Sequence, residues 1–306
     1  MQVLAGSQAN ARLVSIGPRS LKGFDRPVEV VSIESPEGSR GSMFSHVERH
    51  EQLGERLVGF LDYWESLPSL QKMRAEMFAE LAPRPAEVIC DIGCGTGAEL
   101  IRIARVVGPE GTVIGIDPSS TMIEVCRDRA QREDVAVQLL ARDGRDTGLP
   151  ADGCDAVRME RVVQHVGNPP ALLAEAKRIT RPGGRVVIAD TDWGSLMIHP
   201  GDRDLIRRFK TALETGPMAE PWAGRILHDT MLASDLENVT SRMYPIYAGL
   251  NAGRPPLSPM FDMFIEARLA TRSEIDDLVA DLAAAFERGG AVVAFTMFVA
   301  SGHVPD

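Results

Sequence analysis

Short apolar runs alternate with amphipathic stretches through the middle of the chain. Stretches with helical spacing lie at 98–107, 119–130 and 170–180, and Ser119 or Ser120 is the expected N-cap of the second. Strands that are apolar on both faces and joined by helices form a parallel sheet with helices on both sides. The pattern therefore predicts an α/β fold, a three-layer sandwich. Its expected strands are residues 87–92, 112–117, 135–140, 154–159 and 185–190.

The flanks of this core have different patterns. On the amino-terminal side, helical spacing runs from Ser45 to Leu67, Pro68 interrupts it, and a second helix is expected over 69–82. On the carboxyl-terminal side we expect helices near 202–214 and 223–235, a strand at 239–247, a helical region at 258–288 and a last strand at 291–302. Residues 1–42 differ in composition and are interpreted as an extension with a linker, in which 12–34 forms two short strands.

Charge and cysteine content exclude several classes of protein. The net charge is −10, which disfavours a broad nucleic-acid surface or an anionic membrane surface. The four cysteines form no C-x-x-C pair and no His lies at zinc-ligand spacing, so we expect free thiols and no metal. The amino-terminal residues lack the pattern of a signal peptide, and no apolar stretch is long enough for a membrane span. We expect a cytoplasmic protein.

A glycine-rich loop follows the first strand of the core, in the sequence DIGCGTGAEL at 91–100. Gly93, Gly95 and Gly97 permit a tight turn and close approach of a ligand, and the pattern also satisfies the dinucleotide fingerprint. Asp91 and Glu99 place negative charge beside the loop, where it would repel a diphosphate. The same charge suits the ammonium group of an amino acid. We therefore favour a methionine-derived cofactor over a nicotinamide dinucleotide.

Four blocks in this order resemble class I S-adenosylmethionine-dependent methyltransferases of the ubiquinone/menaquinone-biosynthesis kind, often labelled methyltransferase type 11. They are VICDIGCGTG, VIGIDPSSTMIEVC, LARDGRDTGLPADGCDAV and ITRPGGRVVIAD. The resemblance spans residues 43–306. It implies a Rossmann-like, mostly parallel seven-stranded sheet with an antiparallel last strand, and helical lids near 45–82 and 255–288. It also implies S-adenosyl-L-methionine as the cofactor.

The resemblance assigns cofactor-binding roles residue by residue. Gly93, Cys94, Gly95 and Gly97 would line the methionine and ribose end, with Asp91 toward the ammonium. Asp117 would accept both ribose hydroxyls, because a carboxylate offers only acceptors; its alternative role is a helix cap. Around the adenine the candidates are Pro118, Met122, Asp143 and Gly144, of which Met122 could be core and Asp143 a turn residue. Near the sulfonium we expect the residues after the fourth strand, including Glu160, Arg161 and His165.

The methyl acceptor is less defined by the sequence. No N/D-P-P-Y/F motif follows the fourth strand, so an O or C atom of a small, apolar or aromatic molecule is favoured over a nucleic-acid or protein amine. The candidate general bases are His199, His165 and His228. His165 could simply pack against the sheet, and the position of His228 on a helix face favours a structural role. Asp192 and Trp193 could wall the acceptor site or anchor a loop. A non-methylating S-adenosylmethionine binder, such as a pericyclic cyclase or a regulatory module, and an NAD-dependent oxidoreductase are the alternatives; oligomeric state is left open.

A second, shorter resemblance lies at the amino terminus. Residues 12–34 resemble the carboxyl-terminal end of class III nucleotidyl cyclase domains, in Gly17, Leu21-Lys22-Gly23, Pro27-Val28 and Val30. The match includes no cyclase metal or base residue. Two interpretations are open: the segment is the relic of a fusion, or translation starts at Met43. We assign the segment no function.

Overall fold

The computed structural model describes residues 12–19, 28–34, 51–215, 218–249 and 257–306. The chain divides into two compact units, residues 1–41 and 42–306. In the first unit, β1 (Arg12–Arg19) pairs antiparallel with β2 (Val28–Glu34), from Arg12 opposite Glu34 to Arg19 opposite Val28. This agrees with the two expected strands. Leu21, Lys22, Gly23 and Pro27 of the shorter resemblance lie outside the described residues.

A seven-stranded sheet organises the second unit, with the strand order β5-β4-β3-β6-β7-β9-β8. The neighbours from β5 to β7 are parallel, whereas β9 is antiparallel to both β7 and β8. The prediction of a mostly parallel sheet with an antiparallel last strand is confirmed. The strands are β3 (Val88–Ile92), β4 (Thr112–Asp117), β5 (Gln138–Ala141), β6 (Cys154–Glu160), β7 (Thr180–His199), β8 (Glu237–Tyr247) and β9 (Val292–His303).

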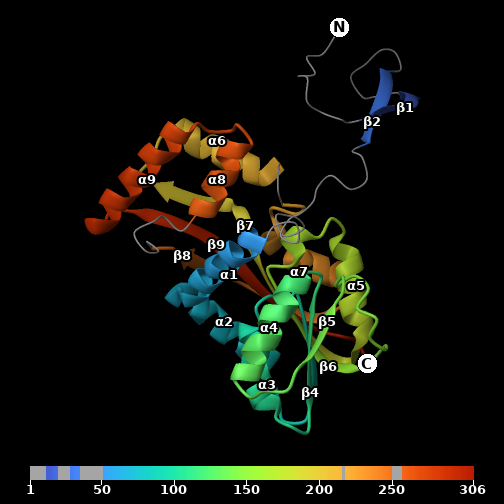
Figure 1. Cartoon of the computed structure of the whole chain (residues 1–306). Coiled ribbons are helices and arrows are strands. Elements are labelled where there is room, and N and C mark those ends of the chain that lie inside the picture. Colours follow the sequence, from blue (N-terminus) through green and yellow to red (C-terminus); the bar gives the residue numbers. More distant parts are fainter. Residues whose placement is uncertain (1–11, 20–27, 35–50, 216–217, 250–256) are drawn as a thin grey trace. The chain divides into compact units, whose positions relative to one another are not determined.

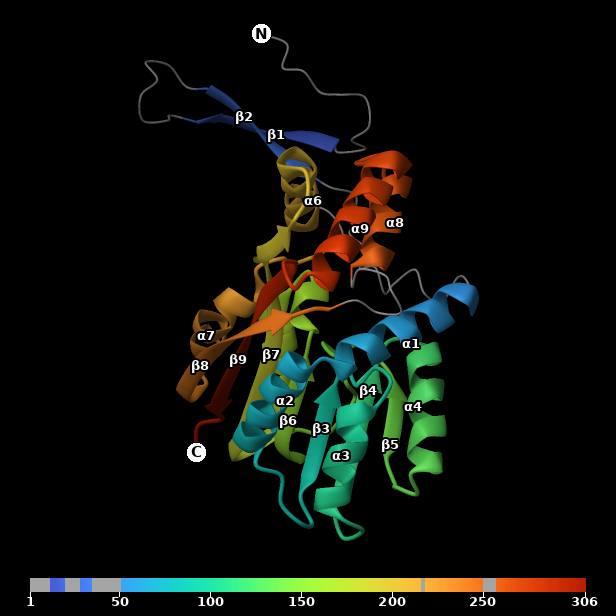
Figure 2. The ribbon, with the colours of Figure 1, turned by 90° about the vertical axis from the view of Figure 1, so that its left-hand side faces the viewer.

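Helices cover both faces of this sheet, as Figures 1 and 2 show. Successive residues of a strand point to opposite faces, so Ile89 of β3 joins one buried apolar cluster and Cys90 the other. One cluster includes α1 (Glu51–Ser66), α2 (Pro68–Leu81), α3 (Ala98–Val107) and α4 (Ser120–Arg132); the other includes α5 (Pro169–Ile179) and α7 (Ala223–Ala233). The result is the expected three-layer sandwich.

The helix boundaries follow capping chemistry that the sequence carries. Pro68 occupies the first turn of α2, where its missing N–H costs nothing. The side chain of Ser119 accepts a hydrogen bond from Met122 N at the start of α4, which confirms its expected capping role. The helical region expected at 258–288 is instead two helices, α8 (Ser258–Glu266) and α9 (Arg272–Glu287). Thr271 and Glu274 form a capping box that starts α9.

The strand expected at 185–190 is much longer than the apolar pattern indicated. β7 continues to His199 because β9 pairs with it on both sides of a bulge that contains Trp193 to Leu196. Figure 2 shows α8, α9 and α6 (Arg203–Thr215) gathered at this end of the sheet. Phe209 packs on Phe264 with ring centroids 4.1 Å apart and on Phe261 at 5.3 Å. These three rings pack within the same buried apolar cluster as Trp193 and Phe295.

Two further expectations concern thiols and membranes. All four cysteines are free and buried. Among the helices that the structure describes, none is both long and apolar enough to cross a membrane.

Candidate functional site

The glycine loop at 93–97 connects the carboxyl end of β3 to the first turn of α3. Gly93 N and Cys94 N both donate to Ile116 O of the neighbouring strand β4, at 2.6 and 3.0 Å. Gly93, Gly95 and Gly97 all have positive φ, from 50° to 86°, a region that favours glycine. The loop therefore has one fixed shape at the carboxyl edge of the sheet, where ligands bind in open α/β sheets.

The three glycines of this loop have different surroundings. A Cβ at Gly97 would overlap Cys126 Sγ of α4, and a Cβ at Gly93 would overlap the side chain of Val162. A Cβ at Gly95 would meet no atom within 4 Å. Gly93 and Gly97 are thus required by packing, whereas Gly95 borders open space. A ligand cradled by the loop fits beside Gly95.

The carboxylate of Asp117 lies beside the same glycine, at the end of β4. One of its oxygens accepts from Gly95 N at 3.0 Å and the other from Ser119 N at 2.9 Å. Burial raises the pKa of Asp117, and these two backbone donors lower it in part. Each oxygen keeps lone pairs beyond the one in use, so the group can accept two further hydrogen bonds. This arrangement fits a ligand with neighbouring hydroxyls.

Asp91 is not an open carboxylate. It is 1% exposed, and both of its oxygens accept from Arg158 Nη1 at 2.8 and 3.0 Å. Burial raises the pKa of Asp91 to about 6, although Arg158 lowers it. A ligand ammonium at this position would have to share the carboxylate with Arg158. The pairing also weakens the electrostatic case that Asp91 repels a diphosphate, because the two charges offset each other.

Arg158 begins a buried ionic chain that ends at the glycine loop. Its Nη2 donates to Glu160 at 2.7 Å, and Arg74 of α2 also donates to Glu160, at 2.9 to 3.0 Å. Burial alone would raise the pKa of Glu160, but Arg74 and Arg158 lower it to about 2. Arg74 lies 3.7 Å from Glu65 of α1, whose carboxylate is 3.4 Å from Thr96 Oγ1 in the loop. Glu160 therefore ties α2 to β6, and its charge is already paired with Arg74 and Arg158 before any ligand binds.

The residue that follows β6, Arg161, combines a positive charge with an unfavourable backbone conformation. Arg161 has φ of 56°, in the left-handed region that is uncommon for a residue with a Cβ and is often found at functional sites. Its Nε lies 3.7 Å from Glu160, and its side chain is 21% exposed. Arg161 is thus a partly exposed guanidinium at the carboxyl edge of the sheet. Its N–H groups can donate hydrogen bonds to an anionic group of a ligand.

The short 3-10 helix η2 (Val163–His165) begins two residues after Arg161. Burial and the nearby Arg161 lower the pKa of His165 to about 3, so its ring is neutral near pH 7. Asp190 at the end of the parallel part of β7 accepts from Thr191 N at 2.7 Å and from Gln164 N at 3.2 Å. Asp190 is fully buried, and burial raises its pKa to about 7. It positions η2 beside the site.

The residues expected around an adenine lie after β4 and β5. Asp143 is exposed and pairs with Arg145, whose side chain lowers the pKa of Asp143. A Cβ at Gly144 would overlap Ile92, so packing requires this glycine. Pro118 is exposed, whereas Met122 is 2% exposed and packs with Leu61 of α1. The edge of the sheet thus brings these residues near Asp117, with Met122 in the core.

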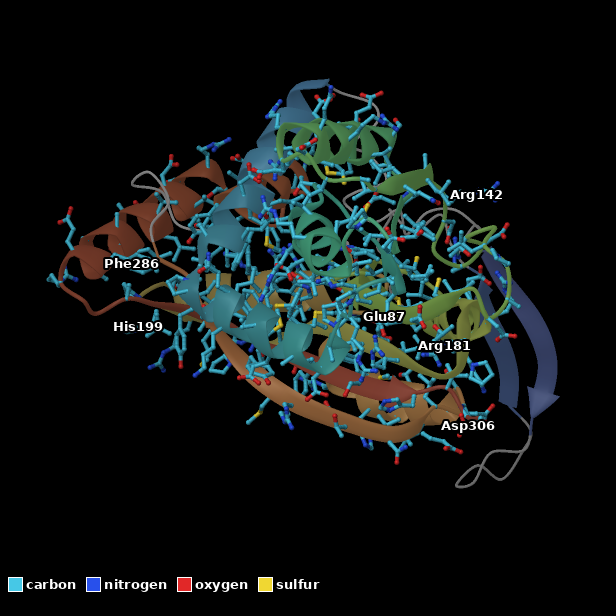
Figure 3. The ribbon with its side chains drawn as sticks, turned by 90° about the horizontal axis from the view of Figure 1, so that it is seen from below. Glu87, Arg142, Arg181, His199, Phe286 and Asp306 are labelled. Carbon is cyan, nitrogen blue, oxygen red and sulfur yellow. The ribbon has the colours of Figure 1, made fainter. Side chains whose placement is uncertain are left out.

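His199 does not lie at the glycine loop. It ends β7 opposite Val292, six residues along β9 from the partner of Asp190, a separation of roughly 20 Å. Figure 3 shows it on the side that carries Phe286 of α9, with Arg142, which follows β5, on the other side. The sequence could not show this, because the extension of β7 depends on pairing with β9.

Asp192 and Trp193 occupy the start of the β7 bulge. Asp192 is 5% exposed and accepts from Arg225 of α7 at 2.6 to 2.9 Å. Trp193 Nε1 donates to Gln164 Oε1 at 2.6 Å, and its ring lies 5.2 Å from that of Phe295. Asp192 is therefore an anchor, whereas Trp193 belongs to an aromatic wall near η2.

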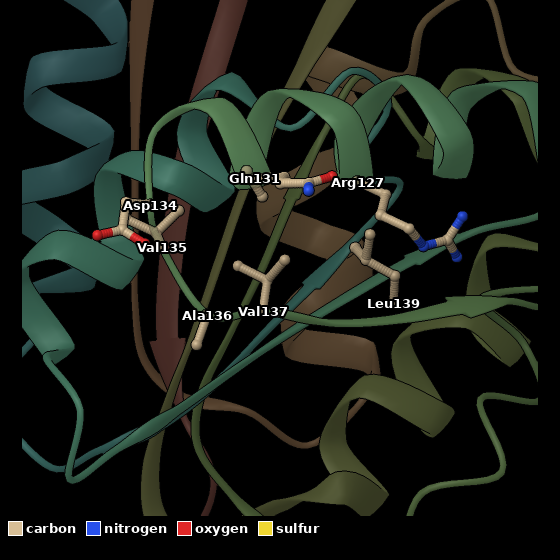
Figure 4. A pocket seen from close by; sticks show the side chains of 8 residues that line it. Arg127, Gln131, Asp134, Val135, Ala136, Val137 and Leu139 are labelled. Carbon is tan, nitrogen blue, oxygen red and sulfur yellow. The ribbon is translucent and has the colours of Figure 1, made fainter.

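A separate groove lies away from this site, between α4 and the segment that leads into β5 (Figure 4). Its lining includes Arg127, Gln131, Asp134, Val137 and Leu139. These residues surround the amino end of β5, whereas Asp117 and Asp143 lie at or beyond carboxyl ends. The groove therefore has no part in the glycine-loop site. Within the described residues, no group of three His, Cys, Asp or Glu side chains could hold a metal ion.

Comparisons with known proteins bear on this architecture. The family described as a methyltransferase domain matches residues 83–229. Nocamycin O-methyltransferase of Saccharothrix syringae is 37% identical over 133 residues, 43% of this chain and 47% of that protein. Demethylmenaquinone methyltransferase of Symbiobacterium thermophilum is 34% identical over 119 residues, 38% of this chain and 47% of that protein.

A solved structure extends the comparison to the fold. Phosphoethanolamine N-methyltransferase 2 of Haemonchus contortus, in complex with S-adenosyl-L-methionine, aligns with a TM-score of 0.56 at 16% identity, over 92% of this chain and 63% of that one. The chain spans about half the length of the curated relatives it matches. The family match contains the glycine loop, Asp117 and η2. Residues 83–229, just under half of the chain, are therefore similar to a methyltransferase domain.

Proposed function

We propose that this protein transfers a methyl group from S-adenosyl-L-methionine to an O or C atom of a small, apolar or aromatic molecule. One observation gives this cofactor its strongest support. The open space beside Gly95 is flanked by the Asp117 carboxylate, whose oxygens can accept further hydrogen bonds. A ribose diol needs acceptors, and an adenosyl group needs room without a Cβ. The names of the relatives support the reaction type.

The residues of the site divide the proposed cofactor into parts. Asp117 would hold the ribose, and Asp143 with the Gly144 N–H would face the adenine. Arg161, as a partly exposed cation, would donate hydrogen bonds to the carboxylate of the methionine part. Gly93, Cys94 and Gly97 would shape the loop around it. Asp91 would face the ammonium only together with Arg158, whose hydrogen bonds it already accepts.

The chain's part in the reaction is mainly one of alignment. When bound, S-adenosyl-L-methionine supplies a methyl group already activated on a sulfonium. Holding an acceptor in line with that methyl is worth up to about 7–11 kcal/mol of barrier. His165, neutral near pH 7, is the proposed residue to orient the acceptor. With a pKa of about 3 it is a weak general base, since proton transfer is most effective when the pKa lies near the working pH.

The organisation around this site is part of the proposal. Residues 43–306 would form the methyltransferase domain, and residues 1–42 an extension without a role in catalysis. We expect α1 and α2 to cover the cofactor and the helices within 255–288 to cover the acceptor. Met260, Phe261, Phe264 and Ile265 of α8 make that cover apolar, while the side chain of Met263 lies outside the described residues. We expect the protein to work in the cytoplasm.

Release of S-adenosylhomocysteine against a panel of phenolic, quinol and carboxylic acceptors tests the proposed reaction. We expect acceptor-dependent release that Asp117→Ala abolishes or reduces at least tenfold. Binding of S-adenosyl-L-methionine with no release on any acceptor would favour a non-methylating binder. Binding of NADH in place of the sulfonium cofactor would favour an oxidoreductase.

A further inference from the structure

Trp64 of α1 has a buried polar atom without a partner. The side chain is 3% exposed, and its Nε1–H forms no hydrogen bond; no other buried side-chain nitrogen or oxygen of the described residues is in this position. Leaving a buried donor unpaired is unfavourable, because the group loses its hydrogen bond to water and gains none in the fold. Native proteins rarely retain such a group unless water, an ion or a ligand satisfies it in the working state.

The neighbours of this indole are aromatic and offer little to a donor. The ring centroid of Trp64 lies 5.2 Å from Phe295 and 5.7 Å from both Phe60 and Tyr63. The Tyr63 hydroxyl already donates to Gly249 O at 2.7 Å. An atom that pairs with the Trp64 N–H would therefore sit among aromatic rings, which favour an aromatic neighbour.

Trp193 provides an internal comparison. It packs against the same Phe295, also at 5.2 Å, but its Nε1–H donates to Gln164 Oε1 at 2.6 Å. Gln164 is itself held in place, because its backbone N donates to Asp190. The fold thus provides a fixed partner for one of the two indoles that flank Phe295 and none for the other.

The residue that follows Trp64 contacts the glycine loop. Glu65 Oε1 lies 3.4 Å from Thr96 Oγ1 of that loop. Trp64 and Cys94 also belong to the same large buried apolar cluster. A molecule held at Trp64 would therefore contact α1, the helix that reaches the glycine loop through Glu65.

We propose that the Nε1–H of Trp64 donates a hydrogen bond to an oxygen of the methyl acceptor, a planar apolar molecule that packs against Trp64 and Phe295. This inference rests on the proposed function, and it makes Trp64 a specificity-determining residue. A site built to pair with a substrate oxygen rejects an analogue that lacks it, because the buried donor is then left unpaired. The acceptor oxygen is thereby distinguished from the rest of an otherwise apolar ligand.

The test uses 2-naphthol and naphthalene, which share a ring system and differ by one oxygen. Binding of each is measured with S-adenosylhomocysteine present, for the wild-type chain, Trp64→Phe and the control Trp222→Phe, which removes an exposed indole. We expect the wild type and Trp222→Phe to prefer 2-naphthol at least tenfold, and Trp64→Phe to show no preference. Equal binding of both compounds by the wild type, or a preference that survives in Trp64→Phe, would overturn the inference.

A second measurement does not depend on how the variants fold. In the wild-type chain labelled with 15N-tryptophan, 2-naphthol is expected to shift the indole proton signal of Trp64, and naphthalene to leave it nearly unmoved. An unmoved signal contradicts the inference. Failure of the proposed function is separately visible: the wild type would bind no sulfonium cofactor, or would release no S-adenosylhomocysteine on any acceptor, whereas failure of this inference alone leaves cofactor binding and release intact.

Discussion

Two regions meet at the carboxyl edge of the sheet, and they are built in opposite ways. The cofactor side, defined as residues 93–97 with Asp117, is polar, contiguous in sequence or nearly so, and fixed by backbone hydrogen bonds. The aromatic side, defined as Trp64, Trp193 and Phe295, comes from three distant elements and is fixed by ring packing. Among the described residues, the buried side-chain donors of the first region all have partners within the fold, whereas the second region contains one unpaired donor, Trp64 Nε1. One part of a site can thus have its hydrogen bonds formed before a ligand binds, while another part keeps a donor for the ligand.

The largest effect is expected from the ionic chain that supports the cofactor side. Arg158→Met would leave Asp91 and Glu160 buried without their shared cation, and breaking such a pair costs about 3–5 kcal/mol. Urea denaturation measures this loss in the free energy of unfolding. Arg207→Met, which removes an exposed pair with Asp204, is the matched control and is expected to cost less than about 1 kcal/mol. Equal losses in the two variants would show that the ion pairs of Arg158 do not stabilise the cofactor side.

The glycines of the loop separate packing from ligand space. Gly97→Ala combines a positive φ with an overlap on Cys126, and we expect a loss of about 2–4 kcal/mol in unfolding free energy. Gly95→Ala meets no neighbour, so its cost to folding should stay near 1–2 kcal/mol, from the backbone alone. Its effect should appear as weaker cofactor binding. If Gly95→Ala binds the cofactor as the wild type does, open space beside Gly95 is not the cradle.

Asp117→Ala is expected to weaken binding of S-adenosyl-L-methionine at least tenfold, about 1.4 kcal/mol, because both ribose hydroxyls lose their acceptor. Calorimetric titration measures the change. Arg127→Ala, in the groove of Figure 4, serves as the control and should leave the affinity within about twofold. An unchanged affinity in Asp117→Ala would count against the site as a whole.

A further effect concerns pH and Asp190, which accepts a hydrogen bond from Gln164 N of η2. Its pKa rises from about 4 in an unfolded chain to about 7 in the fold, so the folded state binds its proton more tightly. Stability from this group is therefore present below about pH 4 and is lost as pH rises toward 7. Relative to the wild type, Asp190→Asn should gain stability between pH 5 and pH 7.5 in urea denaturation. A constant difference, or one of opposite sign, contradicts the pKa shift.

The sequence predicted where the glycine loop and Asp117 lie in the fold, because these parts are local. The glycine spacing, the strand before it and Asp117 at the end of the next strand all lie within 30 residues, and periodicity and turn chemistry determine them. The helix cap at Ser119 was found in the same way.

The aromatic side and the ionic chain could not be predicted, because they depend on which strands pair and in what register. Arg158 meets Asp91 only because β6 lies next to β3 with those residues opposite each other. Trp64 meets Phe295 only because α1 packs near β9. An Arg and a Glu two residues apart in an apolar strand, in RME at 158–160, were the one available signal of buried charge.

Calorimetric titration of the purified chain with S-adenosyl-L-methionine, S-adenosylhomocysteine and NADH, each alone, tests most directly what the glycine loop holds. We expect both sulfur compounds to bind one site with micromolar or tighter affinity and NADH to show no saturable heat. Saturable binding of NADH, with none of either sulfur compound, would contradict the assignment of the loop and of Asp117 to an adenosyl-methionine ligand.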